Sequence, residues 1–210
     1  MSTERDILGS PLTELNGVGP ALAAKLEKLG LYRVEDLLFL LPLRYEDRTR
    51  VVPIGSVRPG QRCVVEGEIQ LTEVVYRRRR MLASTLSDGT GWLTMRLFHF
   101  SRSQQAALAR GTQLRCFGEV RGIPGKLEMI HPEYKRIGPA GGMPLEETLT
   151  PVYPGTEGIQ QGRLRRLTDI ALELLERNPL TDWLGPGMGT SSMRLPSLDA
   201  AIRQLHRPPL

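Results

Sequence analysis

Residues 91–100 contain a row of aromatic side chains with an arginine among them. If this segment is a β-strand, alternation places one set of residues on a common face, namely Trp92, Thr94, Arg96, Phe98 and Phe100. The opposite face then carries a set typical of a protein core, Leu93, Met95, Leu97 and His99. Bases stack on exposed aromatic rings while cationic side chains contact the phosphates, so the first face predicts single-strand binding. The alternative is that Trp92 and one phenylalanine pack under neighbouring helices, because the chain has only four Phe and two Trp.

Four consecutive arginines, Arg77, Arg78, Arg79 and Arg80, lie between two predicted strands and therefore in a hairpin loop. Four adjacent cations cannot share one acidic partner, so we expect them to reach solvent. Cations in such a loop neutralise several phosphates and make DNA binding strongly salt-dependent. The alternative is a solvated charge run with no ligand.

A third candidate site is the glycine-rich turn that precedes the first predicted helix. Gly17 and Gly19 flank a valine, Pro20 follows, and Lys25 comes one turn into the helix. Glycines allow a phosphate to approach the backbone closely, and a helix N-terminus offers free N–H groups. The pattern resembles the helix-hairpin-helix motif of many DNA-repair proteins. The alternative is a tight turn between two helices, with Pro20 as the first helical residue.

The residues needed for catalysis or for metal binding are missing from the sequence. A P-loop requires G-x-x-x-x-G-K-[ST], whereas Gly125-Lys126 is followed by Leu127, and Val120 stands where the first glycine belongs. The three histidines, His99, His131 and His206, have no metal-like spacing, and we interpret them as structural. We therefore expect no catalytic residue, no metal and no cofactor in this chain.

Composition is that of an ordinary water-soluble protein with a preference for polyanions. The 210 residues are 40% hydrophobic and 24% charged, with a net charge of +5 at pH 7. The two cysteines, Cys63 and Cys116, are too few for a disulfide framework and lie in apolar runs, which indicates buried, reduced thiols. The sequence contains no apolar stretch typical of a signal peptide or a membrane span, so we expect a cytoplasmic protein.

The elements that must position these residues follow from periodicity. From Leu12 to about Leu41 the pattern is helical, with Gly30 at a C-terminal cap position and Pro42 closing the second helix. From about Gly60 to Ile137 the pattern has period 2 and predicts five strands, over Cys63–Leu71, Met81–Ser87, Gly91–Phe100, Gln113–Val120 and Leu127–Ile137. Asp88-Gly89 predicts a turn, and Gln104–Ala109 a short helix between the third and fourth strands. This order is that of a five-stranded OB-fold, a Greek-key β-barrel, and a small sandwich is the alternative.

Beyond the strands the sequence predicts further helices. Gln161–Arg177 is amphipathic, and Leu198–Leu205 forms a short last helix after a Gly/Pro/Ser-rich stretch. The fold class is thus α+β, a barrel flanked by N-terminal and C-terminal helices. We expect an N-terminal helical region at 1–55, the barrel at 56–140, and at 141–210 a C-terminal helical segment that leads into a linker. The chain ends at Leu210 without a clear terminal element, which suggests a fragment of a longer protein.

Five motifs in order give the sequence a family resemblance. They are Leu41–Arg48, Phe98–Phe100, Met129–Tyr134, Leu149–Pro154 and Leu205–Pro209. Together they resemble the N-terminal wedge region of the bacterial RecG helicase, over essentially the whole chain. The resemblance implies an ATP-dependent DNA helicase or translocase that remodels stalled forks and Holliday junctions in repair and recombination. It also implies that ATP and Mg²⁺ belong to a motor domain located after this chain.

The resemblance also implies roles for particular residues and partners. In the family an aromatic of the third barrel strand stacks on a base at the junction, and Phe98 stands at that position. Other members carry a second stacking aromatic four residues on, where this chain has Arg102, so that Phe100 is the alternative for the second contact. The expected partners are branched DNA with single-stranded character, the motor domain in cis and single-strand-binding protein, with the chain itself a monomer.

A different function class is a protein-interaction module. An OB-fold groove also accepts an extended peptide, such as the tail of single-strand-binding protein. Salt separates the two functions, because DNA binding through Arg77–Arg80 weakens steeply with salt whereas an apolar peptide groove does not.

Overall fold

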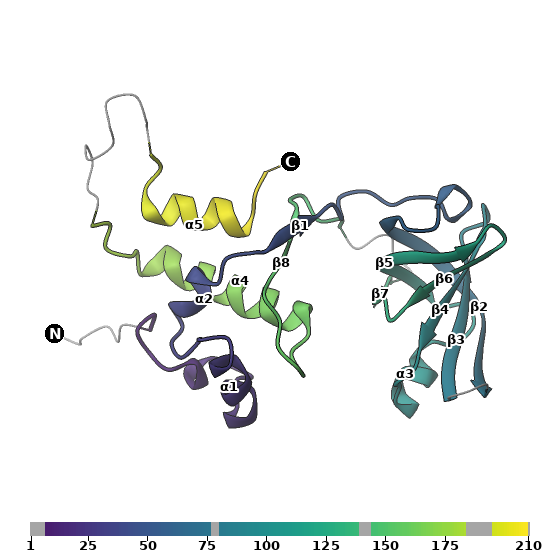
Figure 1. Cartoon of the computed structure of the whole chain (residues 1–210), viewed down its shortest axis with the longest axis horizontal. Coiled ribbons are helices and arrows are strands. Elements are labelled where there is room, and N and C mark those ends of the chain that lie inside the picture. Colours follow the sequence, from purple (N-terminus) through teal and green to yellow (C-terminus); the bar gives the residue numbers. More distant parts are fainter. Residues whose placement is uncertain (1–6, 77–79, 139–143, 184–194, 210) are drawn as a thin grey trace. The chain divides into compact units, whose positions relative to one another are not determined.

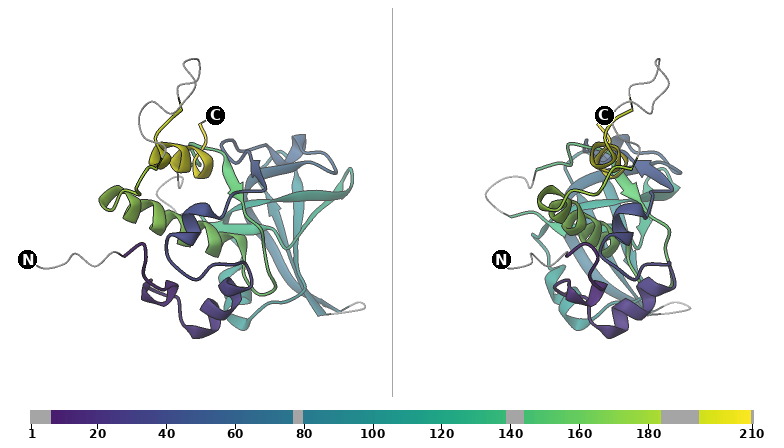
Figure 2. Two further views of the ribbon diagram at one scale, coloured as in Figure 1. Left: turned by 60° about the vertical axis from the view of Figure 1, so that its left-hand side comes forward. Right: turned by 90° about the vertical axis from the view of Figure 1, so that its left-hand side faces the viewer.

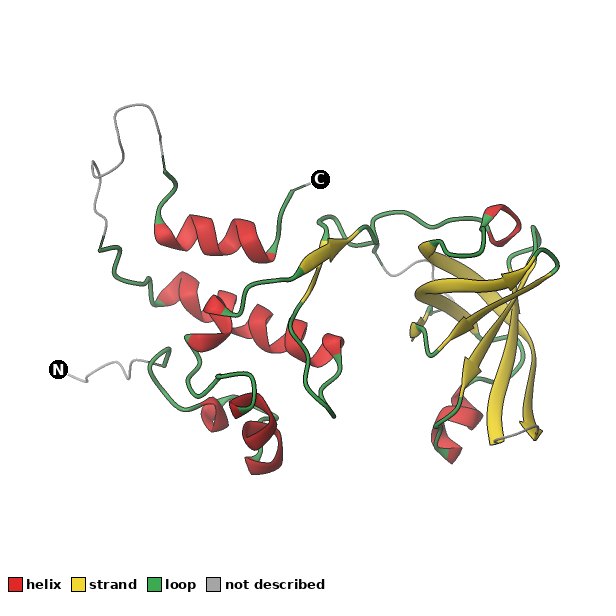
Figure 3. Cartoon of the chain, in the orientation of Figure 1, coloured by secondary structure: helices red, strands yellow, loops and turns green. Residues whose placement is uncertain are grey.

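The computed structural model describes residues 7–76, 80–138, 144–183 and 195–209. The chain forms two compact units, one made of residues 1–46 with 147–210, and the other of residues 47–146. Strands dominate the second unit and helices the first (Figure 3). The boundaries expected from the sequence, 1–55, 56–140 and 141–210, treat the two helical segments as separate. In the structure they share one hydrophobic core, which joins Leu12 and Leu37 to Leu164 and Ile202.

The sheet unit consists of a mostly antiparallel, curved sheet of six strands (Figure 1). The strands are β2 (Arg62–Tyr76), β3 (Arg80–Ser87), β4 (Trp92–Leu97), β5 (Gln113–Ile123), β6 (Lys126–Ile130) and β7 (Glu133–Arg136), in the order β2-β3-β4-β6-β5-β7. One half of β2 pairs with β5 and the other half with β3, so the sheet curves back on itself. Among the described strands, β4 and β6 form the one parallel pair, and an isolated bridge between Val51 and Val64 is also parallel.

Alternation along the strands builds the core of this unit. Buried side chains from five strands form one cluster, which includes Val65, Leu82, Met95, Cys116 and Met129. Two helical turns accompany the sheet, α3 (Arg102–Ala107) between β4 and β5, and a 3-10 turn at Ile54–Ser56 before β2. The expected helix at Gln104–Ala109 begins two residues earlier, because Ser101 caps it and forms a capping box with Gln104.

Two predicted strands end sooner than periodicity indicates. The third stops at Leu97 rather than Phe100, and the expected Leu127–Ile137 strand is divided into β6 and β7 at His131-Pro132. His131 has a positive φ of 47°, and Pro132 has no N–H to donate to a ladder. In contrast the predicted turn at Asp88-Gly89 is confirmed, since Gly89 has φ of 86° and the Asp88 carboxylate accepts the N–H of Thr90 at 2.8 Å.

The helical unit contains a 3-10 turn at Leu12–Glu14 and the helices α1 (Pro20–Glu27), α2 (Asp36–Phe39), α4 (Gln161–Arg177) and α5 (Leu198–His206). Helix α4 lies between α1 on one side and α5 on the other in every view of Figures 1 and 2. The predicted bounds of α4 are confirmed, and so is Gly30 after α1, where φ is 77°. The second predicted N-terminal helix, expected to run to about Leu41, covers only Asp36–Phe39.

Periodicity did not predict a short two-stranded sheet in this unit. Strand β1 (Arg44–Glu46) pairs antiparallel with β8 (Thr150–Val152). Directly after β8, the buried Tyr153 hydroxyl donates to Nδ1 of His206 at 2.8 Å. His206 Nε2 lies 2.9 Å from the Leu38 carbonyl oxygen, which can only accept, so Nε2 carries the proton. His206 is therefore a structural residue, as expected, and it joins α5 to α2 and β8.

Candidate nucleic-acid interface

The outward face of β4 carries the residues that alternation assigned to it. Trp92 is 61% exposed, Thr94 and Arg96 are half-buried, and the intervening Leu93, Met95 and Leu97 are buried. His99 was expected on the buried face, but it is exposed because the strand has already ended at Leu97. Beyond that point alternation no longer decides where a side chain lies.

Phe98 lies one residue beyond β4 and is half-buried. Its backbone N–H donates to Nε2 of His131 at 3.1 Å. The rings of these two residues are 5.3 Å apart at their centroids, with their planes at 65°. The residue with the expected stacking role is therefore held at the end of a strand and is partly exposed.

Phe100 occupies different surroundings from Phe98. It packs partly buried against the core of the sheet unit, and the Arg80 guanidinium lies 4.4 Å from its ring centroid. The predicted row of Trp92, Phe98 and Phe100 is consequently not one continuous face. Phe100 packs against the core of the sheet unit, whereas the alternative interpretation expected Trp92 and one phenylalanine to pack under neighbouring helices.

The cations around this surface differ in their availability. Arg96 is ion-paired with Glu128, and its Nη1 lies 3.4 Å from the Met81 sulfur. Arg102 is the first residue of α3, is exposed, and has no acidic partner among the described residues. Arg96 thus reaches any phosphate only in competition with Glu128, whereas Arg102 offers its full charge.

The arginine run falls largely outside the described residues. The structure does not describe Arg77, Arg78 or Arg79, while Arg80 begins β3 and is exposed. Its guanidinium covers the Phe100 ring, which is a cation–π contact. The position of the run between β2 and β3 agrees with the expected hairpin.

The glycine-rich turn of the helical unit has the conformation that its sequence indicates. Gly17 has φ of 86°, and Gly19 is the N-cap of α1, with Pro20 as the first helical residue. No atom lies within 4 Å of where a Gly19 Cβ would stand, so the backbone is open there. The Lys25 ammonium lies 3.4 Å from the Gly158 carbonyl oxygen and is exposed to solvent at that contact.

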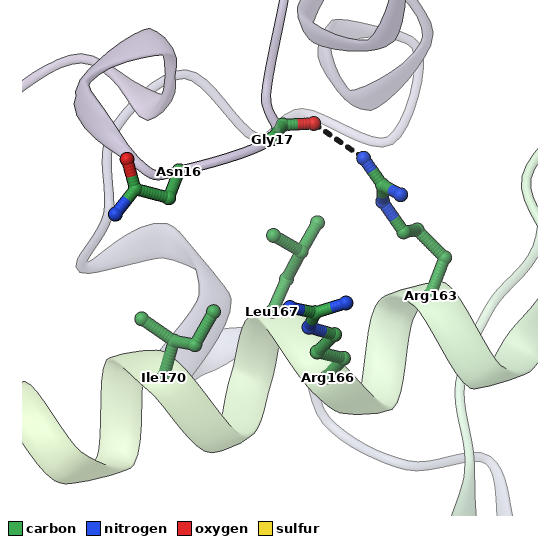
Figure 4. Close-up of a pocket in the computed structure, with 6 residues that line it drawn as sticks. All are labelled: Asn16, Gly17, Arg163, Arg166, Leu167 and Ile170. Atoms are coloured by element: carbon green, nitrogen blue, oxygen red, sulfur yellow. Dashed lines mark hydrogen bonds between the residues drawn. The ribbon is translucent and has the colours of Figure 1, made fainter.

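Two arginines of α4 complete a basic pocket at this turn, and sequence reasoning missed both. A pocket of about 200 Å³ is lined by Asn16, Gly17, Arg163, Arg166, Leu167 and Ile170 (Figure 4). The Arg163 guanidinium donates to the Gly17 carbonyl oxygen, and Leu167 and Ile170 form the apolar side (Figure 4). Arg166 is exposed and has no acidic partner in the described part of the chain.

A sequence signal for these arginines existed. Arg163, Arg165 and Arg166 stand in the first two turns of α4, and its first turn has no acidic residue. The helix dipole favours acidic side chains at this end, so three cations there do not serve helix stability. Such a cluster at a helix N-terminus is the pattern by which the sequence could have marked these arginines as candidate binding residues.

An ion pair between a buried arginine and an exposed glutamate in the sheet unit was missed as well. Arg48 is 7% exposed, and its two terminal nitrogens each donate to Glu133 at 2.9 Å. The same guanidinium lies 3.8 Å from the centroid of the buried Phe117 ring. This pair joins two of the sequence motifs and holds Glu133, the first residue of β7, two residues after His131.

The structure supports the interpretation of the cysteines as buried thiols. Burial raises the pKa of Cys116 to about 12 and also raises the pKa of Cys63. Among the described residues no group of three or more His, Cys, Asp or Glu is placed to hold a metal ion. None of the helices in that part of the chain combines the length and apolar character of a membrane span.

Comparison with known proteins gives the family. A family model described as the RecG wedge domain matches residues 12–174. The chain belongs to the RecG wedge family. It is 48% identical to the ATP-dependent DNA helicase RecG of Escherichia coli K12 over 199 residues, which is 95% of this chain and 28% of that protein. RecG of Haemophilus influenzae is 43% identical over the same share of both chains.

A solved structure agrees with the RecG wedge assignment. The match to the structure of RecG bound to a three-way DNA junction covers 100% of this chain and 28% of the RecG chain, with a TM-score of 0.76 and 25% sequence identity. This chain therefore spans little more than a quarter of the length of its RecG relatives.

Proposed function

We propose that the chain recognises branched DNA, such as replication forks and Holliday junctions, and separates the arms at the branch point. The observation that carries this proposal is the match of the whole chain to RecG bound to a three-way DNA junction. The net charge of +5 and the exposed arginines near Phe98 and Gly17 support it, since phosphate contacts supply most non-specific DNA affinity.

The proposed fold of the sheet unit is a five-stranded OB-fold barrel with β7 added to β5. Support comes from the pairing order, in which β2, β3, β4, β6 and β5 follow one another and β5 pairs with β2 again. In chain order, helix α3 stands between the third and fourth of these strands, β4 and β5, as the sequence indicated. OB-folds bind oligonucleotides on the face of their second and third strands, here β3 and β4.

In this proposal Phe98 stacks on an unpaired base at the branch, and the exposed Trp92, at the opposite end of β4, offers a second ring. Arg102 and the run Arg77–Arg80 contact phosphates, and Arg96 does so in exchange for Glu128. Phe100 supports Arg80 rather than a base, because its ring already contacts the core and the guanidinium.

A second set of phosphate contacts is proposed in the helical unit. It comprises Gly17, Gly19 and Lys25, with Arg163 and Arg166 added from the pocket of Figure 4. Glycine N–H groups and guanidinium groups both donate to phosphate oxygens, and neither reads the base sequence. This set therefore positions a DNA arm without specifying it.

The motor activity belongs to the longer protein. RecG relatives are ATP-dependent DNA helicases, so we infer that ATP and Mg²⁺ act in a motor region in cis, and no residue of this chain is assigned to them. In such a protein the chain acts as a monomeric wedge in the cytoplasm, in DNA repair and recombination.

The test compares a three-way junction, a fork and a plain duplex of equal length for binding to the chain by fluorescence anisotropy across a salt series. We expect tighter binding to the branched DNAs and a slope of about −0.9 per duplex phosphate contacted. Equal affinity for all three DNAs contradicts the branch-recognition proposal. Tight, nearly salt-independent binding of a single-strand-binding protein tail, without DNA binding, favours the peptide-binding alternative instead.

A further inference from the structure

His131 contacts Phe98 through both backbone and ring, although 33 residues separate them. Nε2 of His131 accepts the Phe98 backbone N–H at 3.1 Å, and the ring planes meet at 65°. The His131 backbone N–H donates in turn to the Arg96 carbonyl oxygen at 2.9 Å. One residue therefore holds the end of β4 and the residue just beyond it.

The backbone of His131 has an unusual conformation. Its φ of 47° is the only positive value at a non-glycine residue among those described. This region costs energy for a side chain with a Cβ, and such residues gather at functional sites. The neighbouring residues hold His131 in this conformation. Pro132 is buried, and Glu133 accepts two hydrogen bonds from Arg48.

The hydrogen bond from the Phe98 N–H to His131 restrains a residue that lies outside the strand. Phe98 follows the last residue of β4, and its N–H has no other hydrogen-bond acceptor in the described part of the chain. An aromatic residue beyond the end of a strand loses conformational freedom when it stacks on a base, and that loss weakens binding. An aromatic residue that is already held in its binding position loses less conformational freedom on stacking.

We propose that His131 is a positioning residue that fixes Phe98 for stacking on an unpaired base, and that it does so with Nε2 unprotonated. The proposal rests on the proposed function, because Phe98 must be the stacking residue. No contact of His131 with DNA is required. The proton of the neutral ring then lies on Nδ1, since Nε2 is the acceptor.

The charged surroundings of His131 favour the neutral ring. The His99 ring stacks near the His131 ring, with centroids 6.2 Å apart and planes at 26°. Arg96 on β4 and Glu128 on β6 are paired with each other. Glu133, on the other side, is paired with Arg48. Burial, and then the nearby His99, lower the pKa of His131.

The sign of the pH effect follows from the hydrogen bond. Because the pKa of His131 is lowered in the folded state, this hydrogen bond is fully present above the ordinary histidine pKa of about 6.5 and is lost only as pH falls through the lowered pKa. A proton on Nε2 turns the acceptor into a donor that faces the Phe98 N–H. Fork preference should decline in acid together with this hydrogen bond.

The experiment follows the Phe98 amide peak in ¹H–¹⁵N spectra of the chain from about pH 8 to about pH 5, with fork and duplex affinities at both ends. We expect the peak to titrate with the His131 ring. His131→Ala should lose fork preference by up to about tenfold near pH 8, within the 5- to 150-fold worth of one stacked base. His131→Gln, whose amide oxygen accepts at every pH, should keep fork preference at both ends and abolish the titration of the Phe98 peak. His99→Ala controls for the other imidazole.

Phe98→Ala, measured in parallel, separates the two levels of the proposal. If Phe98→Ala loses fork preference while His131→Ala keeps it and the Phe98 amide does not titrate, the positioning role is wrong and the proposed function stands. If Phe98→Ala keeps fork preference, the stacking function and the positioning role both fail. Urea unfolding of each variant excludes loss of folding as the cause, and the paired Ala and Gln variants share the same backbone strain.

Discussion

At the scale of single residues, the exposure of Phe98 decides what its removal costs. We expect Phe98→Ala to weaken fork binding by about 1–3 kcal/mol, the usual worth of one stacked base, and to change duplex binding little. The unfolding free energy of the Phe98→Ala variant should fall by much less than the ~3–5 kcal/mol that a fully buried Phe→Ala change costs, because the Phe98 ring is half-buried.

The neighbouring residue supplies the matched control for Phe98. Leu97 is 4% exposed and lies on the core face, so Leu97→Ala should cost about 2–5 kcal/mol of stability without changing the ratio of fork to duplex affinity. Measurement of both affinities and of urea unfolding on the two variants separates stacking from packing. Large destabilisation by Phe98→Ala with unchanged fork preference would place Phe98 in the core and transfer the stacking role to Trp92.

A second residue-scale prediction concerns the buried Tyr153–His206 pair. Burial lowers the pKa of His206, despite the opposing hydrogen bond to Leu38. The neutral ring is therefore favoured in the folded state, so its contribution to stability is present above about pH 6.5 and is lost as pH falls. We expect the wild-type unfolding free energy to drop more between pH 8 and pH 5 than that of His206→Gln. An equal drop in the two proteins contradicts this prediction.

At the scale of elements, the β2–β3 hairpin carries the arginine run. Replacement of Arg77–Arg80 by alanine should weaken binding to all DNAs by a similar factor and flatten the salt slope by about 0.9 for each duplex phosphate that the variant no longer neutralises. Replacement by four lysines is the control, because point charges on phosphates tolerate that change. Unchanged affinity and slope in the alanine variant mean that the run is solvated surface.

Helix α4 allows a matched test of the second phosphate site. Arg166 in the second turn of α4 lines the pocket. Arg177 in the last turn is exposed, and its positive charge interacts favourably with the helix dipole. We expect Arg166→Ala to reduce affinity about equally for forks and duplexes and to reduce the salt slope by about 1, while Arg177→Ala leaves both unchanged. Equal effects of the two substitutions indicate a general loss of charge rather than a site.

At the scale of the whole molecule, the chain spans 28% of the length of its RecG relative from Escherichia coli, and we propose that it serves as the DNA-binding part of such a protein. The sequence has no P-loop, so the isolated chain should neither hydrolyse ATP nor unwind DNA. The measurement is ATPase activity with and without forked DNA, in a preparation free of other helicases. DNA-stimulated hydrolysis that copurifies with the chain contradicts the prediction.

The sequence by itself determined the features that depend on local patterns. The apolar stripe of Gln161–Arg177 predicts α4 over the same residues, and Asp88-Gly89 predicts the turn before β4. The alternation of Leu93, Met95 and Leu97 gives the buried face of β4 correctly. These features follow from the periods of helix and strand and from turn geometry, which neighbouring residues decide among themselves.

The tertiary structure alone decided which distant residues meet. The three-residue strands β1 and β8 have no readable period, and they form only because they pair with each other. Arg96 looks like a free cation in sequence but is paired with Glu128 on a parallel strand, and Arg163 reaches the Gly17 turn from the other end of the chain. His131 joins Phe98 because the chain leaves the ladder at Pro132. Contacts of this kind depend on packing between segments far apart in the sequence, which no local pattern encodes.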